Sequence, residues 1–248
     1  MIKAIIAAGL ILAAGVAQAT ECRVERFDGA GFTICEVDLT REDLRLFLRD
    51  ADGAVMGSFT RVEQSLPPGR TLGFAVNGGM FHDDRRPVGL YIEDGRQEMR
   101  VITSAGPGNF GMLPNGVFCI MEGRAAVIES RAYAANPPAC RHATQSGPML
   151  VIDGALHPRF LQDSASLNIR NGVGVAASGT RAYFAISDEP VNFHHFGRLF
   201  RDHLGTPNAL YLDGRVSRLY APSVGRNDFG FPLGPILGTV VDEDGAGR

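Results

Sequence analysis

Short apolar runs alternate with polar turns along most of this chain. The runs are rich in β-branched and aromatic residues, and glycine, proline, asparagine or aspartate bounds them, which is typical of β-strands. We predict strands over 32–37, 72–76, 88–92, 117–120, 125–128, 149–152, 174–177, 182–186, 209–212 and 236–241. Hairpin-like turns, Glu122-Gly123 and Ser178-Gly179, separate two pairs of these runs.

Two segments show helical spacing instead. Residues 191–204 form the clearer one, with Pro190 suited to a first turn and Gly205 able to end the helix. Its apolar residues are Phe193, Phe196, Leu199, Phe200 and Leu204. A weaker helix over 58–66 is stopped by Pro67-Pro68. Many strands with few helices predict an α+β fold with a mixed or largely antiparallel sheet, and the absence of a linker-like tract predicts a single domain.

The first residues have the pattern of an export signal. Lys3 supplies the charge, residues 5–16 are almost wholly apolar, and Ala17-Gln18-Ala19 fits a cleavage site. An uncleaved membrane anchor is the alternative, but the apolar run is shorter than the roughly 20 residues that a spanning helix needs. We therefore expect a signal peptide at 1–19, a single domain at 20–248, and a periplasmic or secreted protein without a later membrane span.

The charge balance gives no reason to expect a nucleic-acid partner, because the formal net charge is −3. All four cysteines, Cys22, Cys35, Cys119 and Cys140, lie after the predicted signal, where an oxidising compartment would pair them. Three pairings are possible, and we favour Cys22 with Cys35 and Cys119 with Cys140, since each would join neighbouring strands. A thiol active site is the competing interpretation, but no cysteine stands beside a histidine in a glycine-bracketed turn.

Polar residues follow or precede three apolar runs. These junctions are Asn77-Gly78-Gly79, Gln145-Ser146-Gly147 and Asp213-Gly214. Glycine lets a ligand approach the backbone closely, so the three strand ends could assemble one polar site from distant segments. Ordinary turns are the alternative, because N-G and D-G are also common hairpin signals.

Read in order, the segments NGGMF, TQSGPMLV, IRNGVGV and NALYLDG resemble the phosphodiester glycosidase family. That family includes a lysosomal enzyme that removes N-acetylglucosamine from a sugar phosphodiester, and exported bacterial members. The resemblance covers roughly residues 75–241. It implies a phosphodiester glycosidase-like fold and a carbohydrate or sugar-phosphate substrate.

The family motifs match this chain at definite positions. They are Asn77, Gly78, Gly79 and Phe81, then 145–148, then Arg170, and finally Asp213 with Gly214. One departure is clear: the animal enzyme resembles Leu-Asp-Gly-Gly-Gly-Ser where this chain has Arg215-Val216 in place of two glycines. The resemblance therefore implies a retained aspartate on a loop of different shape, and a substrate that can differ.

The leaving group of a sugar phosphodiester is a phosphate, which is a weak base. A cation that stabilises its negative charge can therefore replace much of the work of a general acid. Arg170 is the candidate for that cation, with a surface salt bridge as the alternative. Asp213 is the candidate base or nucleophile, or else it caps a turn. Asp188 is either a second carboxyl group or the cap of the following helix.

The amides Asn77 and Gln145 are expected to hydrogen-bond sugar hydroxyls or phosphate oxygens. The N–H groups of the neighbouring glycines, Gly78, Gly79 and Gly147, could form an anion-binding nest, with Phe81 and Ser146 beside them. His82-Asp83-Asp84 could bind a divalent metal, but adjacent side chains converge poorly on one ion and an exposed turn explains them equally well. We predict no metal and no cofactor.

The sequence thus predicts an exported hydrolase that cleaves a glycosidic bond in a sugar phosphodiester or another anionic glycan. The alternative is a periplasmic protein that binds glycans without cleaving them, with Asp213 and Arg170 as ligand contacts. Fold resemblance alone does not transfer a reaction.

Overall fold

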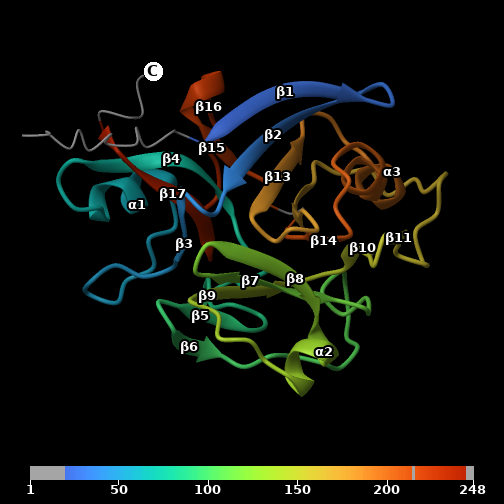
Figure 1. Ribbon diagram of the computed structural model, residues 1–248, viewed down its shortest axis with the longest axis horizontal. Coiled ribbons are helices and arrows are strands. Elements are labelled where there is room, and N and C mark those ends of the chain that lie inside the picture. Colours follow the sequence, from blue (N-terminus) through green and yellow to red (C-terminus); the bar gives the residue numbers. More distant parts are fainter. Residues whose placement is uncertain (1–19, 214–215, 244–248) are drawn as a thin grey trace, which may run out of the picture.

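The computed structural model describes residues 20–213 and 216–243, and their strands form three sheets (Figure 1). Residues 1–19, the predicted signal peptide, and Gly214 lie outside the described residues. All of the strand pairs in the described ranges are antiparallel. The predicted α+β fold with a largely antiparallel sheet in one domain is therefore confirmed.

The largest sheet has seven strands. In spatial order they are β1 (Glu21–Phe27), β2 (Ala30–Asp38), β13 (Arg181–Ser187), β12 (Asn171–Val175), β14 (Asn208–Tyr211), β10 (Met149–Ile152) and β11 (Ala155–Leu156). The second sheet contains β16 (Arg226–Asn227), β15 (Leu219–Ala221), β4 (Arg70–Asn77), β17 (Ile236–Asp242) and β3 (Asp43–Phe47). The third contains β6 (Arg96–Met99), β5 (Tyr91–Glu93), β9 (His142–Ser146), β7 (Gly116–Met121) and β8 (Arg124–Glu129).

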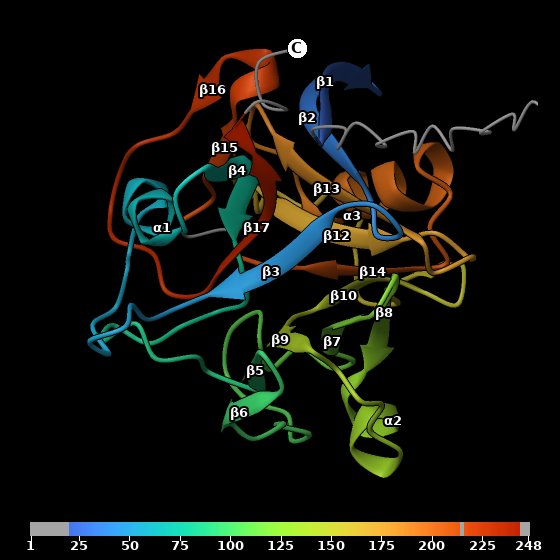
Figure 2. The same cartoon turned by 60° about the vertical axis from the view of Figure 1, so that its left-hand side comes forward.

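Three short α-helices lie in the described residues, namely α1 (Phe59–Ser65), α2 (Ser130–Ala135) and α3 (Phe193–Arg198). A π-helical turn, Leu199–His203, continues α3, and a 3₁₀ turn covers Pro222–Val224. In the turned view of Figure 2, α3 lies beside the seven-stranded sheet and α1 beside the second sheet. Phe196 and Phe200 pack with Phe32 and Ile34 of β2, so α3 and the π-helical turn cover one face of the large sheet.

The three sheets meet in one hydrophobic core. Phe184 of β13 lies with its ring 4.9 Å from that of Phe74 of β4 and 5.8 Å from that of Phe118 of β7. One ring from each sheet thus joins the centre of the fold. Because the large sheet is covered on both faces, its strands alternate between two cores: on β2, Ile34 packs under α3 while Cys35 faces the central core.

Most predicted strands are present, and the differences follow from local contacts. The run 88–92 pairs as a strand only from Tyr91, because the N–H of Leu90 donates to the side chain of Gln145 instead of to a neighbouring strand. The run 174–177 belongs to β12, which begins earlier, at Asn171. The prediction did not include β1, β3 or β9, whose patterns are more polar or more mixed.

Both predicted helices are present but shorter than expected. Ser58 caps α1 by accepting the N–H of Arg61, and Asn192 caps α3 by accepting the N–H of His195. Pro190 therefore precedes the helix instead of forming its first turn. Gly205 follows the π-helical turn with a φ of 62°, the left-handed conformation that glycine adopts without steric cost.

The favoured disulfide pairing is confirmed: Cys22 joins Cys35, and Cys119 joins Cys140. Cys22 and Cys35 are direct partners across β1 and β2, so the first bond fixes an edge hairpin. The second ties β7 to the segment before β9. No helix in residues 20–213 or 216–243 is both long and apolar enough to cross a membrane.

Candidate functional site

A cleft of about 710 Å³ opens beside the ends of several strands. Its wall contains residues from the segment after β4, from the end of β14 and from the loop before β17. The lining residues are Met80, Phe81, His82, Asp83, Arg85, Val88, Gly108, Asn109, Asn168, Tyr211, Asp213, Val216 and Phe231. Two of the predicted site residues, Phe81 and Asp213, therefore face one cleft.

A buried chain of amides joins the second sheet to the seven-stranded sheet behind this cleft. Asn77, at the end of β4, accepts a hydrogen bond on Oδ1 from Nδ2 of Asn171 at 2.8 Å. Oδ1 of Asn171 in turn accepts the backbone N–H of Asp213 at 2.8 Å. Asn77 and Asp213, 136 positions apart in the sequence numbering, are thus linked through one side chain, which fixes the backbone that carries the carboxylate.

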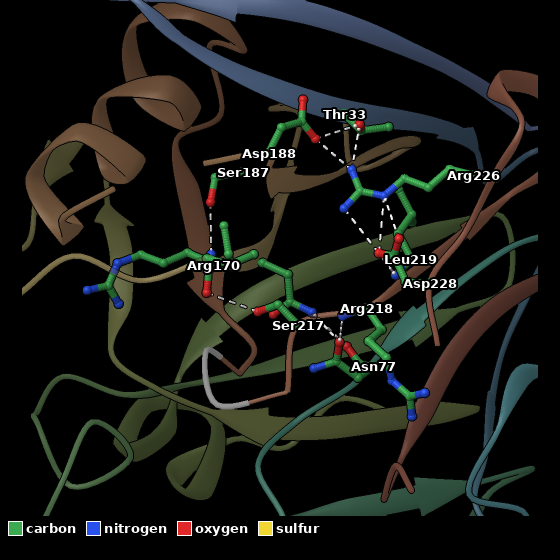
Figure 3. Close-up of polar contacts among 12 residues, drawn as sticks. Thr33, Asn77, Arg170, Ser187, Asp188, Ser217, Arg218, Leu219, Arg226 and Asp228 are labelled. Carbon is green, nitrogen blue, oxygen red and sulfur yellow. Dashed lines mark hydrogen bonds and ion pairs between the residues drawn. The ribbon is translucent and has the colours of Figure 1, made fainter. Parts of the chain in front are cut away.

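The side-chain nitrogen of Asn77 has no hydrogen-bond partner within the described residues. Its Oδ1 also accepts the backbone N–H of Arg218 at 2.9 Å, as Figure 3 shows, and a backbone N–H can only donate. This contact identifies the oxygen, so the remaining atom is Nδ2. Asn77 is 0% exposed and Nδ2 has no hydrogen-bond partner within the described part of the chain. Unpaired buried donors are rare because they cost about 1–3 kcal/mol, which marks Nδ2 as a group that a ligand or water can satisfy.

Strand alternation places Tyr211 beside Asp213 in the cleft wall. Residues two apart on an extended chain point to the same side, and Leu210 and Leu212 face the central core. Tyr211 packs instead on the α3 side, and both it and Asp213 line the cleft. Asp213 is 8% exposed. The segment 209–213 therefore supplies a phenol and a carboxylate to the same surface.

Arg170 lies directly behind that wall and not in it. Its guanidinium is centred 3.6 Å from the ring centroid of Phe193 and 5.5 Å from that of Tyr211. Nε donates to the carbonyl of Val191 at 2.8 Å and Nη2 to that of Ser166 at 2.9 Å. Backbone carbonyls thus occupy two of the three nitrogens that Arg170 would need for the predicted contact with phosphate.

The alternative role for Arg170, a surface salt bridge, is wrong. The side chain is fully buried, and none of the ion pairs found within residues 20–213 and 216–243 involves it. Its Nη1 has no hydrogen-bond partner in the same ranges. Burial lowers the pKa of Arg170, and the neighbouring Tyr211 partly opposes this effect. A buried guanidinium behind the cleft wall adds positive potential there, next to the carboxylate of Asp213.

Burial also raises the pKa of Tyr211 well above its ordinary value, and the charge of Asp213 adds to the rise while Arg170 partly opposes it. The phenol thus stays protonated across the physiological pH range. It can donate a hydrogen bond into the cleft but is poorly suited to lose its proton.

The second predicted junction serves the fold. Oε1 of Gln145 accepts the N–H groups of Leu90 and Ile102, at 3.0 and 2.9 Å. Its Nε2 donates to the carbonyl of Ile102 at 2.6 Å and to the hydroxyl of Ser130 at 2.7 Å. All of its polar capacity is used inside the protein, so the expectation that this amide contacts a sugar is not met. Ser146 donates to the carbonyl of Leu212, which ties β9 to the residue before Asp213.

The glycines at both junctions allow close packing. Gly78 donates its N–H to the carbonyl of Pro235 at 2.7 Å, and Gly79 donates to Oγ1 of Thr144 at 3.2 Å. The predicted anion nest is therefore wrong for these two amides, which already have protein partners. A Cβ on Gly79 would collide with the carbonyl of Gln145, and one on Gly147 would lie 2.6 Å from Cβ of Asn115.

Asp188 does not line the cleft. Its Oδ1 accepts the hydroxyl of Thr33 at 3.0 Å and pairs with Nη1 of Arg226 at 2.6 Å (Figure 3). Because Asn192 caps α3, the prediction that Asp188 caps this helix is wrong. The ion pair joins β16 to the end of β13, so Asp188 connects the second sheet with the seven-stranded sheet.

His82 and Asp83 are exposed and line the cleft. Within the described ranges, no group of three or more histidine, cysteine, aspartate or glutamate side chains is arranged to hold a metal ion. The segment thus contributes polar groups to the mouth of the cleft.

Asn171 and Tyr211 are among the site residues that the sequence analysis missed. Asn171 is the link between Asn77 and Asp213, and Tyr211 lines the cleft. Signals for both were present: Asn171-Gly172 repeats the Asn-Gly pattern of Asn77-Gly78, and Tyr211 stands two positions before Asp213 in an extended run. Phe231 had no sequence signal, since its loop joins the cleft only in the fold.

Comparisons with known proteins concern the family and the fold of this chain. The phosphodiester glycosidase family model matches residues 70–230. YigE of Escherichia coli (strain K12) is 32% identical over 179 residues, which cover 72% of this chain and 70% of that protein.

Solved structures share the fold at low identity. The catalytic domain of zebrafish N-acetylglucosamine-1-phosphodiester alpha-N-acetylglucosaminidase, auto-inhibited by its pro-peptide, is 15% identical with a TM-score of 0.61, covering 89% of this chain and 81% of that chain. A Burkholderia pseudomallei K96243 protein, named for its inferred export, is 13% identical with a TM-score of 0.52, covering 85% and 74%. By its motif order, its fold and the extent of the family match, the chain belongs to the phosphodiester glycosidase family.

Proposed function

We propose that this protein is an exported hydrolase that cleaves the glycosidic bond of a sugar phosphodiester or another anionic glycan. The family membership supports a glycosidase reaction. The observation that carries the proposal is the composition of one cleft wall: the carboxylate of Asp213 lies beside the phenol of Tyr211, and the buried guanidinium of Arg170 stands behind them.

The leaving group determines what the wall must supply. When the bond between C1 of the sugar and the phosphate oxygen breaks, its electron pair stays on that oxygen. The leaving phosphate monoester is a weak base that needs no proton to leave, so stabilisation of the negative charge replaces the general acid. The protonated hydroxyl of Tyr211 would donate a hydrogen bond to the departing oxygen, and the charge of Arg170 behind it would favour the same anion.

Asp213 would act at C1 as the base or the nucleophile. As a base, its carboxylate takes the proton from a water molecule whose oxygen bonds to C1; as a nucleophile, it bonds to C1 first and water then hydrolyses the intermediate. Both routes release free sugar and a phosphate monoester. The hydrogen bond from the Asp213 N–H to Asn171 would hold the carboxylate in position for either.

The test is turnover of sugar-1-phosphodiesters and aryl glycosides, followed by mass spectrometry of the released sugar. We expect selective cleavage of the phosphodiesters and a fall in kcat of about 10²–10⁴-fold in Asp213→Asn. Asp52→Asn is the matched control, because Asp52 is exposed and does not line this cleft. Equal turnover by Asp213→Asn and the wild type would contradict the proposed role.

A non-catalytic glycan-binding protein is the second candidate, favoured by the cleft's aromatic residues Phe81 and Phe231. It predicts saturable glycan binding by the wild type and by Asp213→Asn, with no sugar released from any substrate. Selective release by the wild type alone would exclude it.

Export is part of the proposal. The signal pattern at 1–19, the two disulfides and the name of the Burkholderia relative support a periplasmic or secreted location. Expression with the native leader, followed by cell fractionation and N-terminal sequencing, should yield a product in the exported fraction that begins at Thr20. A cytoplasmic product that retains Met1 would contradict it.

A further inference from the structure

Two phenylalanines in the loop between β16 and β17 are almost fully exposed, but only one of them faces the cleft. Phe229 is 82% exposed and Phe231 is 78% exposed. Phe231 lines the cleft, whereas Phe229 does not. Large exposed rings cost solvation free energy, so a ring held at the mouth of a cleft indicates a surface that a ligand covers.

Three of the hydrogen bonds that hold this loop lie at or after Phe231. The carbonyl of Phe231 accepts Nη2 of Arg218, the N–H of Leu233 donates to Gly57 at 2.8 Å, and the carbonyl of Pro235 accepts the N–H of Gly78 at 2.7 Å. Gly234, between Leu233 and Pro235, packs against the ring of Phe81 so closely that a Cβ at this position would collide with that ring. The backbone around Phe231 is thus fixed before a ligand arrives, which lowers the entropy cost of binding.

Arg85 is a cationic residue of the same cleft. Its guanidinium is centred 5.4 Å from the ring centroid of Phe81. None of the ion pairs found within residues 20–213 and 216–243 involves Arg85. The neighbouring residue, Arg86, does not line the cleft, and its guanidinium pairs with the carboxylate of Asp84 at 2.6 Å.

We propose that Phe231 and Arg85 form an outer subsite that binds a pyranose ring carrying an anionic group. The ring of Phe231 stacks on the apolar face of the sugar, and Arg85 pairs with a carboxylate or a phosphate on that sugar. The inference rests on the proposed function for its class of ligand, an anionic glycan. It concerns binding and specificity, and it requires no bond to break.

Within this cleft, Arg85 and Phe231 match the two parts of an acidic sugar, although Asp83 and Asp213 also line it. A guanidinium matches the geometry of carboxylate and phosphate oxygens, and an aromatic face matches the C–H surface of a pyranose. His82 and Asp83 also line the cleft and are exposed, so they leave room for polar contacts with hydroxyl groups. An acidic sugar uses both kinds of group at once.

The test measures binding to the purified Asp213→Asn protein by titration calorimetry or by NMR. The probes are tetragalacturonate, which is acidic through carboxylates, glucose 6-phosphate, which is acidic through phosphate, and neutral maltotetraose. We expect Phe231→Ala to weaken binding of tetragalacturonate by about tenfold, as the loss of one stacked aromatic predicts. Arg85→Asn should weaken only the acidic probes, also by about tenfold, and the probe that shows this loss identifies the anion.

Asparagine is chosen at position 85 because the residue has a φ of 70°, which asparagine tolerates better than most side chains. Phe229→Ala and Arg86→Gln are the matched controls, and each should leave the dissociation constants within about twofold, below the tenfold effect of one good contact. Thermal melts check that every variant is folded.

Three outcomes would overturn the subsite. The first is unchanged binding in both Phe231→Ala and Arg85→Asn. The second is an equal loss of neutral and acidic probes in Arg85→Asn. The third is self-association that both Phe229→Ala and Phe231→Ala abolish without an effect on glycan binding, which would assign the loop to protein docking.

The use of Asp213→Asn separates this inference from the proposed function. Binding that depends on Phe231 and Arg85 supports the subsite even if the wild type releases no sugar. Turnover by the wild type with no dependence on these two residues removes the subsite and leaves the hydrolase proposal standing.

Discussion

Asn77 and Gln145 each begin one of the polar junctions predicted from the sequence, and both side chains are buried amides, but the fold uses them differently. Gln145 makes four hydrogen bonds inside the protein, two as acceptor and two as donor. Asn77 accepts on Oδ1 and keeps Nδ2 without a partner in the described ranges. A polar residue at a strand end thus becomes a candidate ligand contact only when the protein leaves some of its hydrogen-bonding capacity unused.

The largest expected effect is on stability, at Gln145. Gln145→Leu leaves the N–H groups of Leu90 and Ile102 and the hydroxyl of Ser130 without their partner. We expect the free energy of unfolding to fall by about 3 kcal/mol, while kcat of the folded protein stays within about threefold. Urea unfolding and activity at low temperature measure the two quantities. A specific loss of kcat with unchanged stability would reverse the assignment.

Asn77 should show the opposite balance. Asn77→Ala removes the free donor and the anchor of Asn171, so we expect kcat to fall by about 100-fold, with the unfolding free energy lowered by about 2 kcal/mol. Steady-state kinetics under conditions where the melt shows a folded variant make this measurement. The contrast between the two amides would be contradicted if both variants showed the same loss of kcat relative to their loss of unfolding free energy.

His142, on the same strand as Gln145, should make the stability depend on pH. Burial lowers the pKa of His142 from 6.5 to about 4, with Asp94 partly opposing and Arg141 and Arg45 adding to the effect. The unfolded chain therefore binds the proton more readily between these values, and stability falls as the pH drops through that window. We expect a loss of about 2 kcal/mol at pH 5 relative to pH 8.

His142→Asn should remove this component, because an amide oxygen can still accept the N–H of Asp94 but does not titrate. Urea unfolding of the wild type and the variant at several pH values makes the comparison. An identical pH dependence in both proteins would show that other groups cause it.

The smallest expected effect is at the cleft wall. Tyr211→Phe removes one hydrogen-bond donor while the ring keeps its packing, so kcat should fall by about tenfold with a nearly unchanged melting temperature. The loss should be smaller for substrates whose leaving group is less charged. An unchanged kcat on sugar phosphodiesters would remove Tyr211 from the reaction.

The sequence predicted the local elements well where one physical signal dominated. The apolar runs of β2, β4, β7 and β17, the glycine turns and the helical spacing of Phe196 and Phe200 depend on neighbours in the chain. The disulfide pairing was predicted from short separations, and the family from the order of four motifs. Edge strands such as β1 were missed, because half of their residues face solvent and the pattern is diluted.

By itself, the sequence predicted the fold class, favoured the cysteine pairing that the structure has and pointed to Asn77 and Asp213 as site candidates, because each left a local pattern. Only the tertiary structure decided the use of each polar atom, since hydrogen-bond partners such as Asn171, Leu90 and Val191 come from distant segments. It also placed Arg170 behind the cleft and brought Arg85 and Phe231 into one lining. Burial and long-range pairing set the free energy of each polar group, and neither can be read from adjacent residues.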